Sequence, residues 1–147
     1  MTEIRAAGDF NLASAEILTS SGTLINIKTN ISQINLFEDV QRNSVSGQML
    51  MHDAGGFVSI GPIIGQEYLS LKLQTSSLSD ENDVIDFTEN VLHVTNVTVS
   101  QVGNKGELIL MNVITSEAVR NQGAVVSRSV KGTYDQFVRA LLENDLK

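Results

Sequence analysis

The chain has 147 residues and no cysteine, which excludes disulfides, thiolate catalysis and cysteine-ligated zinc. Its apolar fraction of 41% and charged fraction of 18% predict one folded domain rather than a charge-driven disordered chain. The formal net charge of −7, with scattered basic residues, argues against a surface that grips nucleic acid phosphates. The sequence contains neither a membrane-length apolar run nor a signal-peptide pattern, so we expect a protein that is made and kept in a cytosol.

An arm and two short strands are predicted at the start of the chain. Residues 1–12 have no sustained hydrophobic period, so we expect an N-terminal arm there. The stretch AEILTSSGTLINIKT then predicts two strands joined by a turn at Ser20, Ser21 and Gly22.

A hairpin is predicted next, over INLFEDVQRNSVSGQMLM. Its first strand has Ile34, Leu36 and Val40 on one face, and its turn lies at residues 42–44. In the return strand, Gly47 interrupts an apolar face, which predicts a bulge or a close backbone approach.

A crossover loop and a half-buried strand follow. The stretch DAGGFVSIGPIIGQ carries four glycines and the only proline, which predicts a structured loop. In EYLSLKLQT, the side chains of Leu69, Leu71 and Leu73 alternate with polar ones and are expected to point inward.

A second hairpin combines VLHVTNVTVSQV and ELILMNVITSEAV around a Gly-Asn-Lys-Gly turn. Its return strand has two apolar faces, so we expect both to be covered, one by a barrel interior and the other by a neighbouring element or subunit. One face carries Leu108, Leu110 and Ile114, and the other carries Ile109, Met111 and Val113.

The last element has a helical period. Apolar residues recur at helical spacing from Tyr134 to Leu142, and Thr133 with Gln136 makes a capping-box signature. We therefore expect an N-terminal arm over 1–12, a β-barrel over 13–132 and an amphipathic helix over 133–147. Because the helix lies at the end of the chain, we also expect further domains to follow it.

Catalytic and metal-binding patterns are weak in this sequence. A triad could combine His52 or His93 with Asp53 or Glu38 and with Ser46, but His52 and Asp53 are adjacent and point to opposite faces of a strand. The acidic run from Asp80 to Glu89 lacks the spacing of a calcium-binding loop. The glycines match neither dinucleotide-binding nor P-loop motifs. We therefore predict no enzyme, no cofactor and no metal.

An ordered set of short sequences points to a family. These are FED at 37–39, SG at 46–47, PIIGQE at 62–67, SE at 116–117 and SRSVKGT at 127–133. In this order the chain resembles the N-terminal part of baseplate hub proteins of contractile-tailed phages, from about Ile25 to Leu142.

The resemblance implies a mainly β fold, an antiparallel β-barrel of the tail-tube type with a C-terminal amphipathic helix. It implies a ring, either a trimer with two barrels per subunit or a hexamer of single barrels. The ring would join the tail tube protein to the central spike protein, with tape-measure protein as a further partner, and DNA would pass through without specific binding. The implied location is the virion tail baseplate, after assembly in the host cytoplasm.

We expect the subunit and ring contacts to involve both turns and one strand face. The turns supply Arg42 and Asn43, and Asn104 and Lys105; the strand supplies Ile109, Met111 and Val113. Glu38, Lys72 and Arg42 are better candidates for salt links between subunits than for catalysis, although ordinary strand-end charges are the favoured explanation.

Two other functions remain open. A soluble β-barrel could bind a peptide or a carbohydrate through the loop from Gly55 to Gly65, and a monomer with a ligand-sized cleft would favour that function. A hydrolase would require an ordered cluster of histidine, serine and aspartate.

Overall fold

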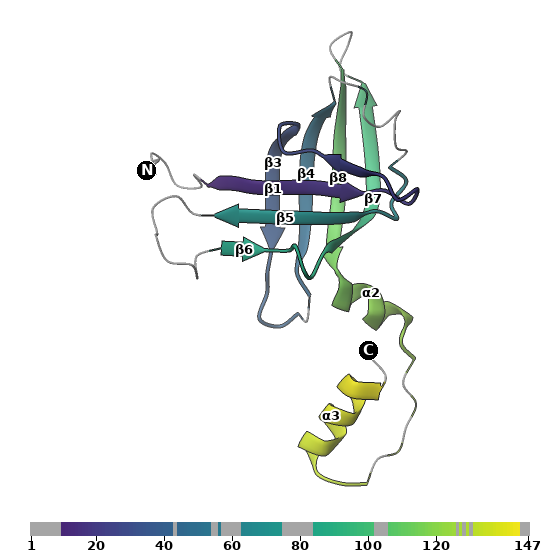
Figure 1. Ribbon diagram of the computed structural model, residues 1–147. Helices are drawn as coiled ribbons and strands as arrows, with labels where there is room; N and C mark the ends of the chain where they lie inside the picture. Colours follow the sequence, from purple (N-terminus) through teal and green to yellow (C-terminus); the bar gives the residue numbers. More distant parts are fainter. Residues whose placement is uncertain are drawn as a thin grey trace.

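The computed structural model describes residues 10–42, 44–53, 56, 63–74, 84–101, 106–125, 127, 129 and 131–144. Within them, one antiparallel sheet of eight strands is followed by two short helices (Figure 1). The strands are β1 Asn11–Leu18, β2 Leu24–Asn26, β3 Ile31–Phe37, β4 Ser46–Asp53, β5 Tyr68–Gln74, β6 Val84–Asp86, β7 Leu92–Gln101 and β8 Glu107–Thr115. The helices are α2 Ser116–Gly123 and α3 Tyr134–Asn144.

The sheet folds over into two layers. Its strand order is β2-β1-β5-β7-β8-β4-β3, and β6 pairs with β5. In Figure 1, β1, β5 and β6 lie across β3, β4, β7 and β8, as in an orthogonal packing of two sheets. Only two residue pairs, Tyr68 with His93 and Leu69 with Leu92, join β5 to β7 at the corner between the layers.

The two ends of the sheet order are consecutive in the chain. Backbone hydrogen bonds extend the strand pairing into the connection from β2 to β3. After β2, the Ile27 N–H donates to the Ala15 carbonyl of β1, and before β3, the Asn30 carbonyl accepts the His52 N–H of β4. No ladder joins β2 to β3 within the described ranges, and the sheet is not closed into a barrel. The predicted mainly β, antiparallel fold is confirmed at this level.

One apolar core fills the space between the layers. As predicted, the side chains of Leu69, Leu71 and Leu73 point inward, with at most 8% of their surface exposed. The other side of the core comes chiefly from β4 and β8, and includes Met49, Met51, Ile109, Met111 and Val113.

This burial corrects part of the expected interface. Ile109, Met111 and Val113 expose 0%, 0% and 3% of their surface, because they face the layer formed by β1 and β5. A neighbouring chain therefore cannot reach these side chains in the folded protein. The outward face of β8 carries Leu108, Leu110 and Ile114 instead.

Gly47 confirms the expected close approach, without a bulge at its own position. A Cβ atom there would lie 2.9 Å from both the Asn35 carbonyl oxygen and Leu36 Cδ2, and 3.1 Å from Val113 Cγ2. The pairing of Gly47 with Leu36 is in continuous register, and the irregularity of this ladder lies between Ile31 and Gln33.

The predicted turn between β1 and β2 is confirmed, residues 103–105 of the Gly-Asn-Lys-Gly turn lie outside the described ranges, and one strand end is misplaced. β1 and β2 pair around a turn in which Gly22 has a φ of 82°. The first hairpin strand ends at Phe37 rather than near Val40, and Val40 is fully exposed in the loop. β1 begins at Asn11, so residues 11 and 12 belong to the sheet, while residues 1–9 lie outside the described ranges.

The second hairpin ends in a helix that the sequence interpretation missed. We expected the return strand to run to Val119, but β8 ends at Thr115 and α2 begins at Ser116. Glu117 in the first turn and Arg120 in the last turn both suit the helix dipole. These local preferences favour a helix once the apolar alternation of β8 stops.

The predicted C-terminal helix is present as α3. The Gln136 side-chain oxygen accepts a hydrogen bond from the Thr133 N–H at 3.4 Å, which is half of the expected capping box. A hydrogen bond from Thr133 also lowers the pKa of Asp135. None of the helices in the described ranges is long and apolar enough to cross a bilayer.

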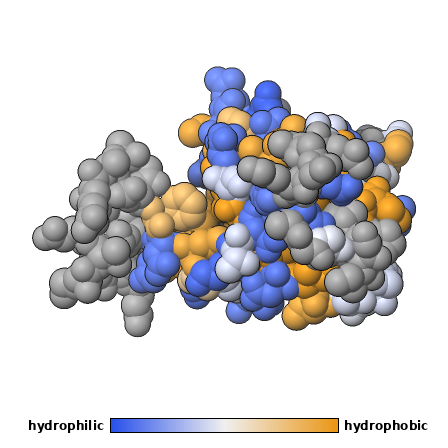
Figure 2. Space-filling model, turned by 90° about the horizontal axis from the view of Figure 1, so that it is seen from above, coloured by the Kyte–Doolittle hydropathy of each residue, from blue (hydrophilic) through white to orange (hydrophobic). Residues whose placement is uncertain are grey.

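Apolar side chains also reach the surface. Seen from above, they lie between hydrophilic residues rather than beneath a continuous polar shell (Figure 2). Exposed members on the strands include Leu24, Phe37, Ile85, Val99 and Leu110, and on α3 they are Tyr134, Val138 and Leu142.

Candidate functional site

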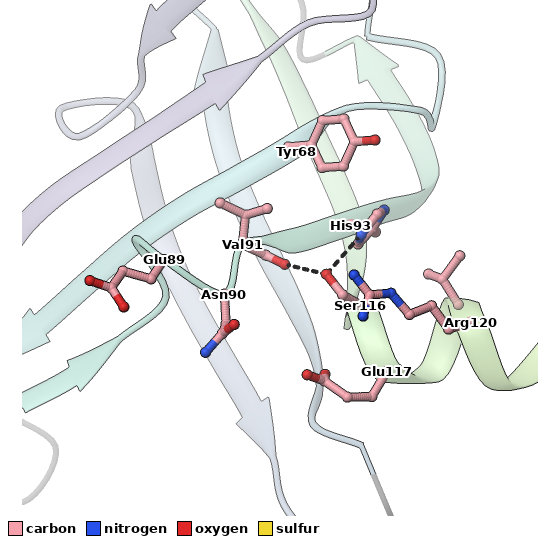
Figure 3. Close-up of a pocket in the computed structure, with 9 residues that line it drawn as sticks. Tyr68, Glu89, Asn90, Val91, His93, Ser116, Glu117 and Arg120 are labelled. Atoms are coloured by element: carbon pink, nitrogen blue, oxygen red, sulfur yellow. Dashed lines mark hydrogen bonds between the residues drawn. The ribbon is translucent and has the colours of Figure 1, made fainter. Parts of the chain in front are cut away.

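A pocket of about 460 Å³ lies where β5, β7 and α2 meet (Figure 3). The corner of the sheet brings these elements together, since Tyr68 on β5 pairs with His93 on β7. Ser116 and Arg120 come from the first and second turns of α2. The complete lining consists of Tyr68, Glu89, Asn90, Val91, His93, Ser116, Glu117, Val119 and Arg120.

The aromatic rings of Tyr68 and His93 form one wall of this pocket. Their centroids are 4.7 Å apart and their planes meet at 64°, which is an edge-to-face contact. The guanidinium group of Arg120 has no ion-pair partner among the described residues, although the pocket also contains Glu89 and Glu117. The pocket thus offers an aromatic wall and charges of both signs.

A hydrogen-bonded chain links His93 to Ser116 and then to the backbone. His93 Nε2 lies 3.0 Å from Ser116 Oγ, and the Ser116 hydroxyl donates to the Val91 carbonyl at 3.2 Å. When the single hydroxyl proton is used in the second bond, Nε2–H donates to the serine oxygen. A nucleophilic serine needs the opposite arrangement, in which its hydroxyl donates to the imidazole. This geometry describes a link between β7 and α2.

The catalytic residues considered from the sequence are not brought together. His52 is half-buried on the outward side of β4, whereas Asp53 is buried on the inward side. Ser46 lies at the opposite end of β4, roughly 20 Å from His52 at the usual strand rise. His93 instead contacts Ser116, which the sequence interpretation had not considered.

Lys72 has a partner within its own chain. Its Nζ lies 2.8 Å from Asp86 Oδ2, across the β5–β6 ladder. Hydrogen bonds from Lys72 and then Thr88 lower the pKa of Asp86 from 3.8 to about 2. Lys72 is therefore less available for a salt link between subunits.

The acidic run considered for calcium is described only in part. Asp86 and Glu89 are described, while Asp80, Glu81 and Asp83 lie outside the described ranges. Within those ranges, no three or more histidine, aspartate or glutamate side chains are grouped so that they could hold a metal ion.

A second pocket, of about 450 Å³, lies beside the β3–β4 loop. Arg42 is exposed there, and its backbone N–H donates to the Asp39 carbonyl. Thr115 also lines this pocket, and its buried hydroxyl has no hydrogen-bond partner in the described chain. The other predicted turn residues, Asn43, Asn104 and Lys105, lie outside the described ranges.

The outward side of β3, β4, β7 and β8 carries no formal charge over most of its length. Paired residues of antiparallel strands share a face, so the register places the outward side chains in rows across the four strands. The rows are Gln33-Leu50-Leu110-Thr98, Asn35-Gln48-Asn112-Asn96 and Phe37-Ser46-Ile114-His93, and His52-Leu108-Ser100 extends them over three strands. We call this surface the uncharged face.

The middle row of the uncharged face consists of carboxamides. Its members Asn35, Gln48, Asn112 and Asn96 lie on four adjacent strands. Gln33 donates to Asn35 at 3.1 Å along β3. Leucine, isoleucine and phenylalanine side chains flank this row, so the surface is partly apolar and can also donate and accept hydrogen bonds.

Local sequence signals for these sites are only partial. The predicted return strand includes Ser116 and ends at Val119, before Arg120, although Thr115 as a cap and Gly123 at the end are signals of a short helix. The rows of the uncharged face have no sequence signal, because they depend on the register between strands distant in the chain.

Comparison with protein-family models gives no match to this chain, and comparison with curated proteins gives none either.

Proposed function

We propose that this chain is a structural component of a phage tail baseplate hub. In this proposal the chain forms a ring, as a trimer or a hexamer, that joins the tail tube protein to the central spike protein. The sheet contributes the wall of a tail-tube type barrel, and DNA passes through the ring without specific binding. The complex resides in the virion baseplate after assembly in the host cytoplasm, and tape-measure protein is a further possible contact.

The observation that carries the proposal is the apolar and uncharged surface left open outside the core. α3 exposes 91% of Tyr134, 50% of Val138 and 57% of Leu142. On the strands, Phe37 is 53% and Leu110 is 37% exposed. Extended surfaces of this kind usually mark contacts with other protein subunits. A net charge of −7 also suits a channel that must not retain phosphates.

The test is the stoichiometry and symmetry of the purified assembly. Native mass spectrometry should give a trimer or hexamer, and electron microscopy of the same sample should show a ring with a central hole. Tail tube and spike proteins should bind opposite faces of that ring. A protein that stays monomeric even when tube and spike proteins are added would overturn the proposal.

The pocket beside α2 favours a second candidate, a soluble module that binds a peptide or carbohydrate. Its volume of about 460 Å³ falls within the size range of small-molecule sites. Tyr68 and His93 offer ring surfaces, and Arg120 offers an unpaired guanidinium within the described chain. A monomer that binds glycans or peptides, and loses binding in both His93→Ala and Arg120→Ala, would favour this function.

A further inference from the structure

We infer that α3 of one copy docks on the uncharged face of a second copy. This inference rests on the proposed ring function and specifies the contact between neighbouring subunits. It assigns α3 as the donor element and the outward side of β3, β4, β7 and β8 as the acceptor.

α3 makes no extensive contact with the described part of its own chain. It has no buried residue and lies beyond the end of the sheet, without extensive contact with any described strand (Figure 1). A helix of 11 residues is only marginally stable alone in water, so its apolar side must be covered for it to persist. Phe137 and Leu141 are half-buried, whereas Tyr134, Val138 and Leu142 stay exposed in the described part of the chain.

The exposed apolar side chains of α3 form a stripe along one side of the helix. Tyr134, Val138 and Leu142 recur at a four-residue spacing and are the most exposed apolar side chains of the helix. Asp135 and Arg139 follow them along a neighbouring stripe. Because residues four apart lie on the same side of a helix, docking through the apolar stripe leaves the charged stripe in water.

The distribution of charge favours the uncharged face as the acceptor. Each copy carries a net charge of −7, so two copies approach most easily where neither buries a charge. The uncharged face meets that condition, because its rows contain no aspartate, glutamate, lysine or arginine. The outward side of the other layer differs, since it carries Glu16 and the Lys72–Asp86 ion pair. The acceptor is therefore the layer containing β8.

The uncharged face combines apolar side chains with carboxamides. Leu50, Leu110 and Ile114 provide apolar contacts for the helix, and helix-on-sheet packing is a common way to bury such surfaces. The carboxamides of Gln48 and Asn112 can hydrogen-bond to the hydroxyl of Tyr134, which lies at the start of α3.

The length of the connection before α3 and the positions of donor and acceptor both allow a contact between copies. Residues 124–133 separate α2 from α3, and ten extended residues span roughly 33 Å. Such a connection is long enough to reach an adjacent copy. Because the donor and acceptor lie at different places on one chain, the contact is head-to-tail, and repeated contacts of this type close into a ring when the rotation permits.

A complementation experiment on full-length chains tests the inference. A donor variant, Val138→Glu with Leu142→Glu, disables α3, and an acceptor variant, Leu110→Glu, disables the uncharged face. Each variant alone should associate at least about tenfold more weakly than the wild type. An equal mixture, with one variant labelled with ¹⁵N, should form 1:1 dimers in native mass spectrometry, because only one intact junction is possible.

Two control variants preserve the proposed contact. Arg139→Glu alters the charged stripe of α3, and Gln74→Glu alters an exposed position on the other layer. Both should assemble as the wild type does. Circular dichroism should show that every variant retains its sheet.

The outcomes separate this inference from the ring proposal. Rings that persist in both disabled variants would overturn the α3 contact and leave the ring standing. A mixture that stays monomeric would also overturn it. So would a monomeric wild type in which α3 packs on the sheet of its own chain. Wild-type chains that join through α3 only as open dimers or filaments would refute the ring and keep the contact.

Discussion

The carboxylate of Glu67 accepts hydrogen bonds from the backbone N–H of Gly65 and from those of its two neighbours, Ile64 and Gln66. Oε2 accepts the Gly65 N–H at 2.8 Å and the Gln66 N–H at 3.0 Å, while Oε1 accepts the Ile64 N–H at 2.7 Å. Glu67 is fully buried, and its own carbonyl accepts the Val94 N–H. Glu67 thus binds residues 64–66 through its side chain and β7 through its backbone carbonyl.

Glu67→Gln should destabilise the fold. The amide nitrogen of glutamine is a donor and would face backbone N–H groups, so at least one of these partly buried donors would lose its acceptor. We expect a loss of about 2 to 3 kcal/mol in the free energy of unfolding, measured with urea. Glu89→Gln, at an exposed position, is the matched control and should change little. Equal unfolding midpoints for the two variants would show that the loop does not depend on this carboxylate.

Gly47→Ala should destabilise the hairpin of β3 and β4. The added methyl group would lie 2.9 Å from the Asn35 carbonyl oxygen, which is backbone and cannot rotate away. We expect a loss of about 1 to 3 kcal/mol in a thermal or urea unfolding experiment. Gly123→Ala is the control, because no atom lies within 4 Å of the corresponding methyl position. A G47A protein as stable as G123A would contradict the close approach.

The Lys72–Asp86 pair should contribute to stability in a pH-dependent way. The pKa of Asp86 falls from 3.8 to about 2 on folding, so the folded state favours the carboxylate. The contribution is therefore complete above about pH 5 and is lost as the pH falls through 4 towards 2. Unfolding free energies of the wild type and Asp86→Asn, measured across this range, should converge at the acidic end.

A direct titration checks the same pair. The carboxyl signal of Asp86 in an NMR titration should have its midpoint near 2 in the wild type and should move upward in Lys72→Met. A midpoint of 3.8 in the wild type would mean that the ion pair does not persist in solution.

The neutral imidazole of His93 should carry its proton on Nε2. The Ser116 hydroxyl already donates to the Val91 carbonyl, so its oxygen is left to accept the Nε2–H. Nitrogen–proton correlation spectra of the ring distinguish the two tautomers. His52, whose ring has no hydrogen bond in the described chain, should show a mixture. If the His93 proton were on Nδ1, Ser116 could donate to Nε2, and a nucleophilic role would need to be reconsidered.

Local periodicity was enough to predict most strands and the terminal helix. The alternation of Leu69, Leu71 and Leu73 and the helical spacing from Tyr134 onward both specify which side of the element is apolar. The turn at Gly22 was also predictable, because few other residues adopt its positive φ. The same local signals failed near Val119, where a short helix interrupts the expected strand.

Side-chain period and composition act locally, and they were enough to predict a chain that folds mainly as antiparallel strands without cysteine chemistry. The packing of the two layers decided which apolar face of β8 is buried, since Ile109 and Leu110 are equally apolar in the sequence. It also decided that His93 meets Ser116 and that carboxamides form a row across four strands. These relationships join residues far apart in the chain, and register and layer packing, rather than local preference, determine them.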